Sequence, residues 1–110
     1  MYVRLAVTLA LLVPALSLAQ MKGDPKVGKA KYDVDCAGCH GKTGKGDGSK
    51  AAQLKTEPGD FTKPDMQAQT DGSLYYKIAK GRDDMPGFKK KIPENDDIWS
   101  IVNFIRTFKK

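Results

Sequence analysis

The sequence has 110 residues, with 19 basic and 13 acidic side chains and a formal net charge of +6. Its thiol and imidazole groups come from two cysteines and one histidine. A chain of this length can form one small domain and no more. Because so small a domain buries a limited core, we expect a cofactor, a metal or a disulfide to support it.

Residues 1–19 have the pattern of a secretory signal peptide. A short basic start that ends at Arg4 precedes an almost wholly apolar run, and Ser17 and Ala19 supply the small residues that a signal peptidase reads. The run is shorter than the roughly 20 residues of a membrane-spanning helix. We therefore expect an exported protein with a cleaved leader at 1–19 and a folded domain at 20–110; an uncleaved N-terminal anchor is the alternative.

The first helix of the domain is predicted over residues 25–35. Asp24 suits the N-cap, because its carboxylate can accept a hydrogen bond from a backbone N–H of the first turn, and Pro25 suits the first helical position. Gly28 and Tyr32 lie four residues apart and therefore share one face of this helix.

Two irregular segments and a second helix follow. Residues 41–49 contain four glycines and are predicted to form a loop, and residues 53–69 are predicted to be extended and irregular. A helix is predicted over residues 71–80. Thr70 or Asp71 suits the N-cap, and Gly81 suits the C-terminal stop.

The last helix, predicted over residues 94–108, has the clearest period. Its apolar side chains recur at helical spacing: Ile98, Ile101, Val102, Ile105 and Phe108. No convincing period-two run predicts a strand. The sequence therefore predicts an all-α domain of three main helices, and loops this long in a small domain indicate that they wrap a bound group.

The stretch Cys36–Gly48 contains both cysteines and the histidine, and four chemistries compete for it. A phosphate-binding loop is excluded, because the position five residues before Gly41 holds a cysteine instead of a glycine and no strand precedes it. A structural zinc site would need a fourth ligand, which only a carboxylate such as Asp33 or Asp35 could supply. A redox dithiol lacks the strand that precedes such a motif, and the C-terminal end of a helix disfavours its thiolate.

The fourth chemistry uses all three residues. The pattern Cys-x-x-Cys-His is the attachment motif of c-type haem. Cys36 and Cys39 are three residues apart, so a helical turn presents both sulfurs to the two vinyl groups on one edge of the porphyrin. His40 can then bind the iron. The sequence therefore predicts one haem c, attached through Cys36 and Cys39.

The second axial ligand is predicted to be Met85. The only histidine is already used, so the candidates are a methionine, a lysine, the N-terminal amine or no ligand at all. A methionine is more often a core filler than a ligand. Met85 departs from that rule because it lies in a loop before Pro86, whose ring restricts the backbone of Met85 to an extended form. Met66 has polar neighbours, and Met21 lies in the loose start of the domain.

With the motif at 36–40 and the stretch Gly81–Phe88 in place, the chain resembles the small class I cytochromes c of bacteria. It is similar to the periplasmic monohaem carriers and to the haem domains of bacterial terminal-oxidase subunits. The resemblance covers residues 24–108, which is nearly the whole domain. It implies a class I cytochrome c fold wrapped around one haem and a periplasmic location.

The resemblance also implies two structural contacts. In the family, the first and last helices cross where a glycine allows close approach and an aromatic ring packs, which here pairs Gly28 and Tyr32 with Ile101 and Phe104. The family also uses a proline carbonyl to accept the N–H of the proximal imidazole. Pro58 is the best match for that proline.

The function that the resemblance implies is one-electron carriage between respiratory redox partners, by a monomer that is not an enzyme. One alternative is a peroxidase or gas sensor in which Met85 is displaced, with Arg82 as the only nearby distal group. Another alternative is a haem subunit bound permanently to a membrane oxidase or dehydrogenase.

Lysines gather after the haem motif and after the Met85 loop: Lys42, Lys45, Lys50, Lys89, Lys90 and Lys91. Solubility is the ordinary role of such residues. A sharper interpretation is a docking surface that steers the protein toward acidic redox partners. Nucleic acid is not expected as a partner, because the protein is predicted to be exported and its aromatic residues belong mostly to helix cores.

Overall fold

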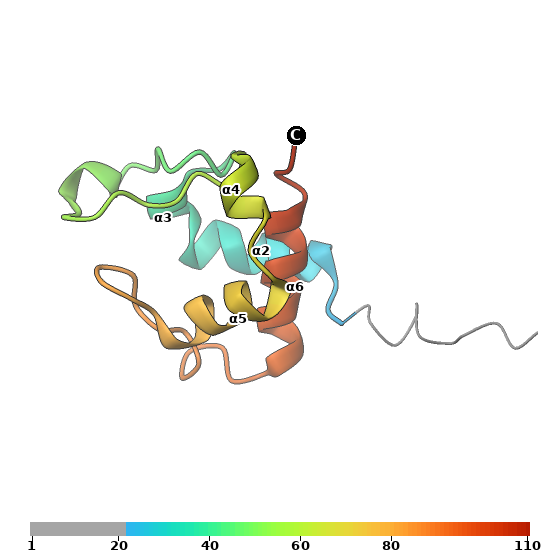
Figure 1. Cartoon of the computed structure of the whole chain (residues 1–110). Coiled ribbons are helices and arrows are strands. Elements are labelled where there is room, and N and C mark those ends of the chain that lie inside the picture. Colours follow the sequence, from blue (N-terminus) through green and yellow to red (C-terminus); the bar gives the residue numbers. More distant parts are fainter. Residues whose placement is uncertain (1–21) are drawn as a thin grey trace, which may run out of the picture.

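The computed structural model describes residues 22–110, so the predicted leader at 1–19 lies outside the described part. Its elements, in chain order, are α2 (Pro25–Asp35), α3 (Ala37–His40), the 3₁₀ turn η1 (Ala51–Gln53), α4 (Pro64–Gln67), α5 (Asp71–Lys80) and α6 (Asn95–Arg106) (Figure 1). Among residues 22–110, β-type pairing is limited to one isolated bridge. The predicted all-α fold with three main helices is confirmed. The short helix α4 falls in a segment that was predicted to be irregular.

Local capping explains where two of the main helices begin and end. The Asp24 carboxylate accepts a 2.9 Å hydrogen bond from the N–H of Lys26, and the Thr70 hydroxyl accepts one of 3.1 Å from the N–H of Ser73. Helix α5 ends at Gly81, whose φ of +73° few residues other than glycine adopt. All three capping residues were predicted from the sequence.

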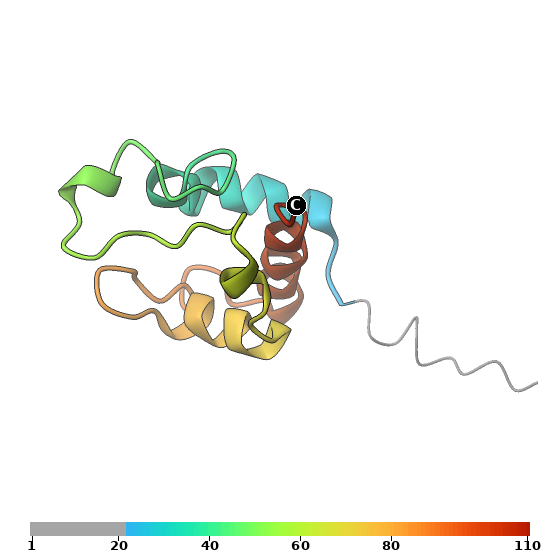
Figure 2. The same cartoon turned by 45° about the horizontal axis from the view of Figure 1, so that its top comes forward.

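Helix α2 packs across α6, and a glycine allows the two backbones to meet (Figures 1 and 2). A Cβ atom on Gly28 would lie 1.8 Å from the carbonyl oxygen of Ser100 and 2.9 Å from the backbone nitrogen of Ile101. One turn further along α2, the Tyr32 ring meets Phe104 edge to face at 5.1 Å between centroids. The predicted crossing is therefore confirmed.

Ser100 is a buried polar residue on the otherwise apolar face of α6 and was not predicted from the sequence. Only 2% of its surface is exposed. Its hydroxyl donates to the carbonyl of Asp96 at 2.7 Å and accepts from the N–H of Asp24 at 2.8 Å. Both polar functions of the hydroxyl are thus satisfied, and the start of α2 is tied to α6.

The hydrophobic core lies where α2, α5 and α6 meet the loops. Its buried members are Tyr32, Cys36, Phe61, Leu74, Ile78, Phe88, Ile92, Ile98, Ile101, Val102 and Ile105. Four of the five apolar positions predicted for the last helix are among them, whereas Phe108 lies beyond the helix end and is half-buried. No helix within residues 22–110 has the length and apolarity needed to cross a membrane.

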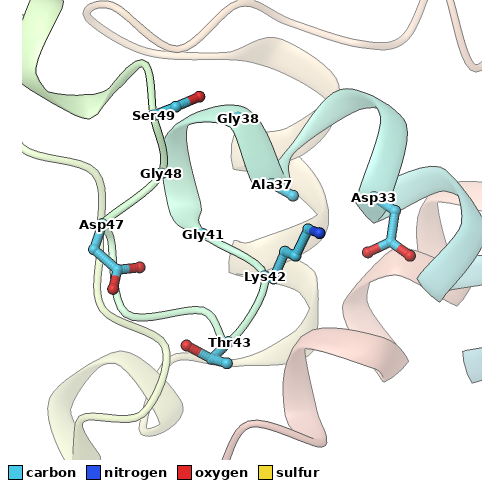
Figure 3. Close-up of a pocket in the computed structure, with 9 residues that line it drawn as sticks. All are labelled: Asp33, Ala37, Gly38, Gly41, Lys42, Thr43, Asp47, Gly48 and Ser49. Atoms are coloured by element: carbon cyan, nitrogen blue, oxygen red, sulfur yellow. The ribbon is translucent and has the colours of Figure 1, made fainter.

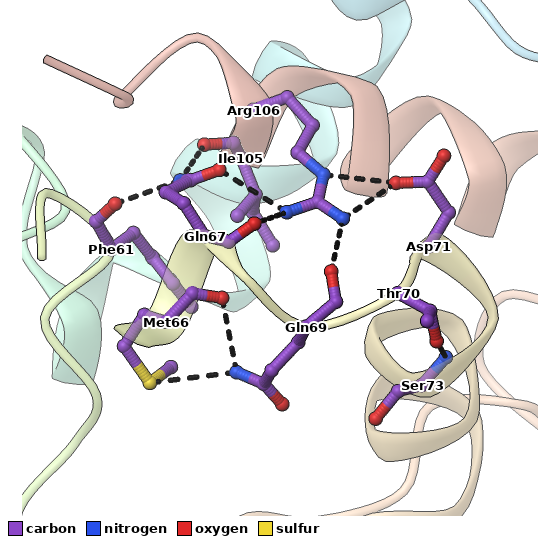
Figure 4. Close-up of polar contacts among 9 residues, drawn as sticks. All are labelled: Phe61, Met66, Gln67, Gln69, Thr70, Asp71, Ser73, Ile105 and Arg106. Atoms are coloured by element: carbon purple, nitrogen blue, oxygen red, sulfur yellow. Dashed lines mark hydrogen bonds and ion pairs between the residues drawn. The ribbon is translucent and has the colours of Figure 1, made fainter. Parts of the chain in front are cut away.

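The Arg106 side chain fastens the segment that contains α4 to the end of α6 (Figure 4). Its guanidinium donates to the carbonyl oxygens of Gln67 and Gln69 and pairs with the Asp71 carboxylate at 2.8 Å. The Gln67 amide donates in turn to the carbonyl of Phe61 at 2.7 Å. This network fixes the backbone that follows the haem motif relative to α6.

Candidate functional site

The two cysteines and the histidine lie on one helical turn. The N–H of His40 donates to the carbonyl of Cys36 at 3.0 Å, and the N–H of Cys39 approaches the same oxygen at 3.3 Å. Both thiols are free; Cys36 is buried and Cys39 is half-buried. The structure therefore presents two unpaired thiols and an imidazole on one turn, with Cys36 at the N-cap of α3 and Cys39 and His40 at its end, as the sequence predicts.

The glycine-rich stretch after the motif closes the C-terminal end of α3. Backbone N–H groups of this loop cap the carbonyls of the short helix, with the pairs Gly41 to Ala37, Gly46 to His40, Gly48 to Cys39 and Lys50 to Gly38. The loop borders an open depression of about 440 Å³ (Figure 3). The glycines thus have a structural role, which agrees with the exclusion of a phosphate-binding loop.

One of these glycines shows why a side chain would not fit. A Cβ atom on Gly48 would lie 2.2 Å from the carbonyl oxygen of Gly38, so the returning loop passes directly over the helix backbone. Close approach of this kind lets carbonyls that α3 itself leaves unpaired find donors. The loop therefore holds the turn that carries the thiols.

The orientation of His40 is set by a backbone carbonyl, but not by the predicted one. Its Nδ1 lies 3.2 Å from the carbonyl oxygen of Gly59, whereas Pro58 was predicted to supply the acceptor. The carbonyl of Pro58 instead faces Gly46, where a Cβ atom would lie 2.6 Å from that oxygen. Because neighbouring carbonyls of an extended segment point in different directions, only one of the two can face the ring.

This contact determines which ring nitrogen of His40 can bind a metal. A carbonyl oxygen can only accept, so Nδ1 carries the proton and Nε2 of the neutral ring keeps its lone pair. Burial lowers the pKa of His40 below its ordinary value, an effect that the Gly59 bond partly opposes. Both features favour a neutral imidazole with Nε2 as the donor atom.

An aromatic contact that the sequence analysis missed restricts the same ring. Phe61 stacks on His40 with 4.6 Å between ring centroids, and Phe61 itself is 6% exposed. The Phe108 ring also stacks on Phe61, with 6.3 Å between the ring centroids. Phe61 lies two residues after Gly59, whose carbonyl contacts His40. This nearness in the chain was the only feature of the sequence that could have predicted the stacking of Phe61 on His40.

Residues 22–110 fit a haem better than the competing chemistries. Burial and the neighbouring Asp35 carboxylate raise the pKa of Cys36 to about 12, so the thiol lacks the thiolate character of a redox dithiol. No group of three or more His, Cys, Asp or Glu side chains in this part of the chain could hold a metal ion. Two free thiols beside a neutral imidazole are the donor set that covalent haem attachment requires.

Met66 lies beside the segment that His40 contacts through Nδ1. A Cβ atom on Gly59 would lie 2.5 Å from the Met66 methyl group, so the thioether packs directly on that residue. The Gln69 amide also approaches the sulfur at 3.5 Å (Figure 4). Met66 thus packs around the acceptor that orients the imidazole.

Met85 lies at the end of a tight turn in the loop between α5 and α6. Its N–H and carbonyl pair with the carbonyl and N–H of Arg82 at 2.8 and 3.0 Å. Asp83 within the turn has a φ of +50°. The Met85 side chain is half-buried and packs against the core cluster.

Comparison with known proteins agrees with this site. Residues 23–105 match the family described as cytochrome C oxidase, cbb3-type, subunit III. A comparison with curated proteins found no significant match. Among solved structures, the KustC0563 c-type cytochrome is 27% identical with a TM-score of 0.66, over 76% of this chain and 98% of that one.

A second solved structure is similar over part of its length. A chain of the Kuenenia stuttgartiensis reducing HAO-like protein complex Kustc0457/Kustc0458 is 25% identical with a TM-score of 0.70. The match covers 78% of this chain but only 44% of that one, so this chain spans less than half of its length. With the Cys-x-x-Cys-His turn in the matched region, the chain belongs to the cbb3-type cytochrome c oxidase subunit III family and is a c-type cytochrome.

Proposed function

We propose that this protein carries single electrons through one haem c, attached by thioether bonds to Cys36 and Cys39, with His40 and Met85 as the axial ligands. The observation that carries the proposal is the hydrogen bond from His40 Nδ1 to the Gly59 carbonyl, beside two free thiols on the same turn. The bound haem supplies an iron that is oxidised and reduced by one electron.

The residues around His40 hold its ring ready for this role. The Gly59 carbonyl fixes the tautomer and raises the basicity of the ring, as the outer partners of metal-bound histidines do. The stacked Phe61 ring covers one face of the imidazole and keeps water from it. The backbone of α3 is capped by the following loop, so the thiols and the imidazole keep one arrangement.

Met85 is favoured over Met66 as the second ligand. Met66 packs on Gly59 and so lies toward the Nδ1 side of His40, while the iron belongs on the Nε2 side. Met85 belongs to a separate loop, between α5 and α6, in a turn closed by backbone pairing with Arg82, and its thioether would supply the second ligand of a bound haem. His/Met ligation raises the reduction potential relative to stronger donor sets.

A closed pair of ligands favours carriage over catalysis. A peroxidase or sensor would need a displaceable Met85 and a polar group built beside the open position. Arg82, the candidate for that group, has an exposed side chain whose ion pair is with its neighbour Asp83 at 3.6 Å. We therefore propose an electron carrier and not an enzyme.

The proposed partners are redox proteins with acidic docking surfaces, met in the periplasm after export. Lys42, Lys45 and Lys50 are exposed around the haem motif, where positive charge would steer encounter. The matched family is described as an oxidase subunit, and one similar chain occurs in a protein complex. Association with a membrane complex is therefore the second candidate, and a free monomeric carrier is the first.

Optical spectroscopy of the haem-loaded protein tests the ligation. We expect a low-spin spectrum with a sulfur-to-iron absorption band in the oxidised state, and no reaction of the reduced protein with carbon monoxide. Met85→Ala should lose the band and bind carbon monoxide. Met66→Ala, the matched control, should keep the band because it removes only packing.

Two results would overturn parts of this proposal. Ready binding of carbon monoxide by the unaltered protein would show an open iron and favour sensing or peroxidase chemistry. Loss of the sulfur-to-iron band in Met66→Ala, with the band kept in Met85→Ala, would transfer the ligand role to Met66.

A further inference from the structure

We propose that Asp84 is a positioning residue for Met85, an inference that rests on the proposed role of Met85 as an iron ligand. Asp84 Oδ2 accepts hydrogen bonds from the backbone N–H groups of Lys55 and Thr56, at 2.7 and 3.0 Å. These donors belong to the segment between η1 and the His40 acceptor Gly59. The carboxylate thus joins the Met85 turn to the part of the chain that orients the imidazole.

The turn transmits this restraint directly to Met85. Asp84 is the residue immediately before Met85, and both lie within the turn closed by the two backbone bonds between Arg82 and Met85. A carboxylate anchored at position 84 therefore fixes the position and direction of the next Cα–Cβ bond. Without the anchor, the turn would be held by its own backbone pairing and by the packing of Met85 against the core.

A second contact fastens the far end of the same loop. Lys91 pairs with the Asp35 carboxylate, whose side chain is only 6% exposed although the lysine is 64% exposed. Asp35 directly precedes Cys36 at the start of the haem motif. Phe88 lies buried between the two anchors, and the buried Ile92 directly follows Lys91. The loop at 81–93 is therefore tied to the haem-binding half of the domain on both sides of Phe88.

Of the two anchors, Asp84 is the one that positions Met85. Lys91 lies six residues beyond Met85, past the buried Phe88 that holds the chain independently. Asp84 forms charge-assisted bonds to two amides and adjoins Met85. Its loss should release the Met85 turn while leaving the buried part of the loop in place.

Imidazole titration of the oxidised, haem-loaded protein tests this inference, because imidazole binds the iron only when Met85 has left. We expect Asp84→Ala to bind imidazole at about tenfold lower concentration than the unaltered protein, with the sulfur-to-iron band still present without imidazole. Asp84→Asn should stay near the unaltered protein, since its amide oxygen can accept the same two N–H groups.

Asp83→Asn is the matched control. It changes the same charge one residue earlier, keeps a side chain that tolerates the positive φ of that position, and has no contact with Lys55 or Thr56. We expect it to leave imidazole affinity unchanged. Hydrogen exchange adds a direct readout: the Lys55 and Thr56 amides should exchange faster in Asp84→Ala and not in Asp83→Asn.

The outcomes separate this inference from the proposed function. An unaltered protein without the sulfur-to-iron band would overturn Met85 ligation itself, and the positioning role with it. A normal band in the unaltered protein combined with equal imidazole affinity in Asp84→Ala would overturn the positioning role alone. Equal weakening in Asp84→Ala and Asp83→Asn would show a general charge effect and overturn it as well.

Discussion

The hydroxyl of Tyr32 donates a 2.7 Å hydrogen bond to the carbonyl oxygen of Gly41, and both residues are buried. Tyr32 lies on α2, and Gly41 directly follows His40, so this bond ties the first helix to the end of the haem motif. Burial raises the pKa of Tyr32 far above its ordinary value, which keeps the hydroxyl protonated and able to donate.

Tyr32→Phe should lower the free energy of unfolding of the haem-loaded protein by about 1 kcal/mol, because it removes a buried hydrogen bond and leaves the Gly41 carbonyl with only the N–H of Gly44, at 3.1 Å, as its donor. Tyr76→Phe removes the same hydroxyl from a side chain that is 61% exposed and should change little. Guanidinium denaturation followed by helix circular dichroism measures both. Equal stabilities of the two variants would contradict a structural role for the Tyr32 bond.

Gly28→Ala should destabilise the protein by about 3 kcal/mol or more, because the new methyl group would meet the backbone of α6, which cannot move without separating the helices. Gly72→Ala is the control: a Cβ atom there has nothing within 4 Å, and alanine should stabilise α5 by up to about 1 kcal/mol. Thermal unfolding of both variants checks the opposite signs. A stable Gly28→Ala protein would mean that the helices cross elsewhere.

Arg106→Lys should cost about 1–2 kcal/mol of stability, because an ammonium cannot reproduce the planar fork that binds two carbonyls and a carboxylate. Asp71→Asn removes only the ion pair, whose carboxylate is 61% exposed, and should cost less than about 0.5 kcal/mol. Denaturant titration ranks the two. The reverse ranking would show that the ion pair, and not the backbone contacts, holds this segment.

The rates of electron transfer to small charged oxidants should depend on the positive charge of the lysines around the haem motif. The rate with ferricyanide, an anion, should fall as salt is added, and the rate with a hexaammineruthenium cation should rise. Exchanging Lys45 and Lys50 for glutamine should weaken both trends. Exchanging Lys22 and Lys26 for glutamine removes the same charge near the start of α2 and should change the salt dependence less. Equal effects of the two exchanges would show that the rates depend on net charge and not on the lysines around the haem motif.

Local chemistry allowed much of the domain to be predicted. The caps at Asp24 and Thr70 and the stop at Gly81 act within a few residues of the chain, so they appear in the sequence as they do in the structure. The same holds for the thiols and the imidazole, which share one turn because they are adjacent in the chain. The Gly28 crossing came from family resemblance, which already contains tertiary information.

The remaining contacts depend on segments that are far apart in sequence. Gly59 rather than Pro58 faces His40, and Asp84 reaches Lys55 across 29 residues. Neither choice has a local cause, because the direction of a carbonyl or a carboxylate depends on how the whole loop is packed. By itself the sequence determined the three main helices, the caps of two of them and the attachment motif. Only the tertiary structure decided which backbone groups orient the imidazole and anchor the Met85 turn.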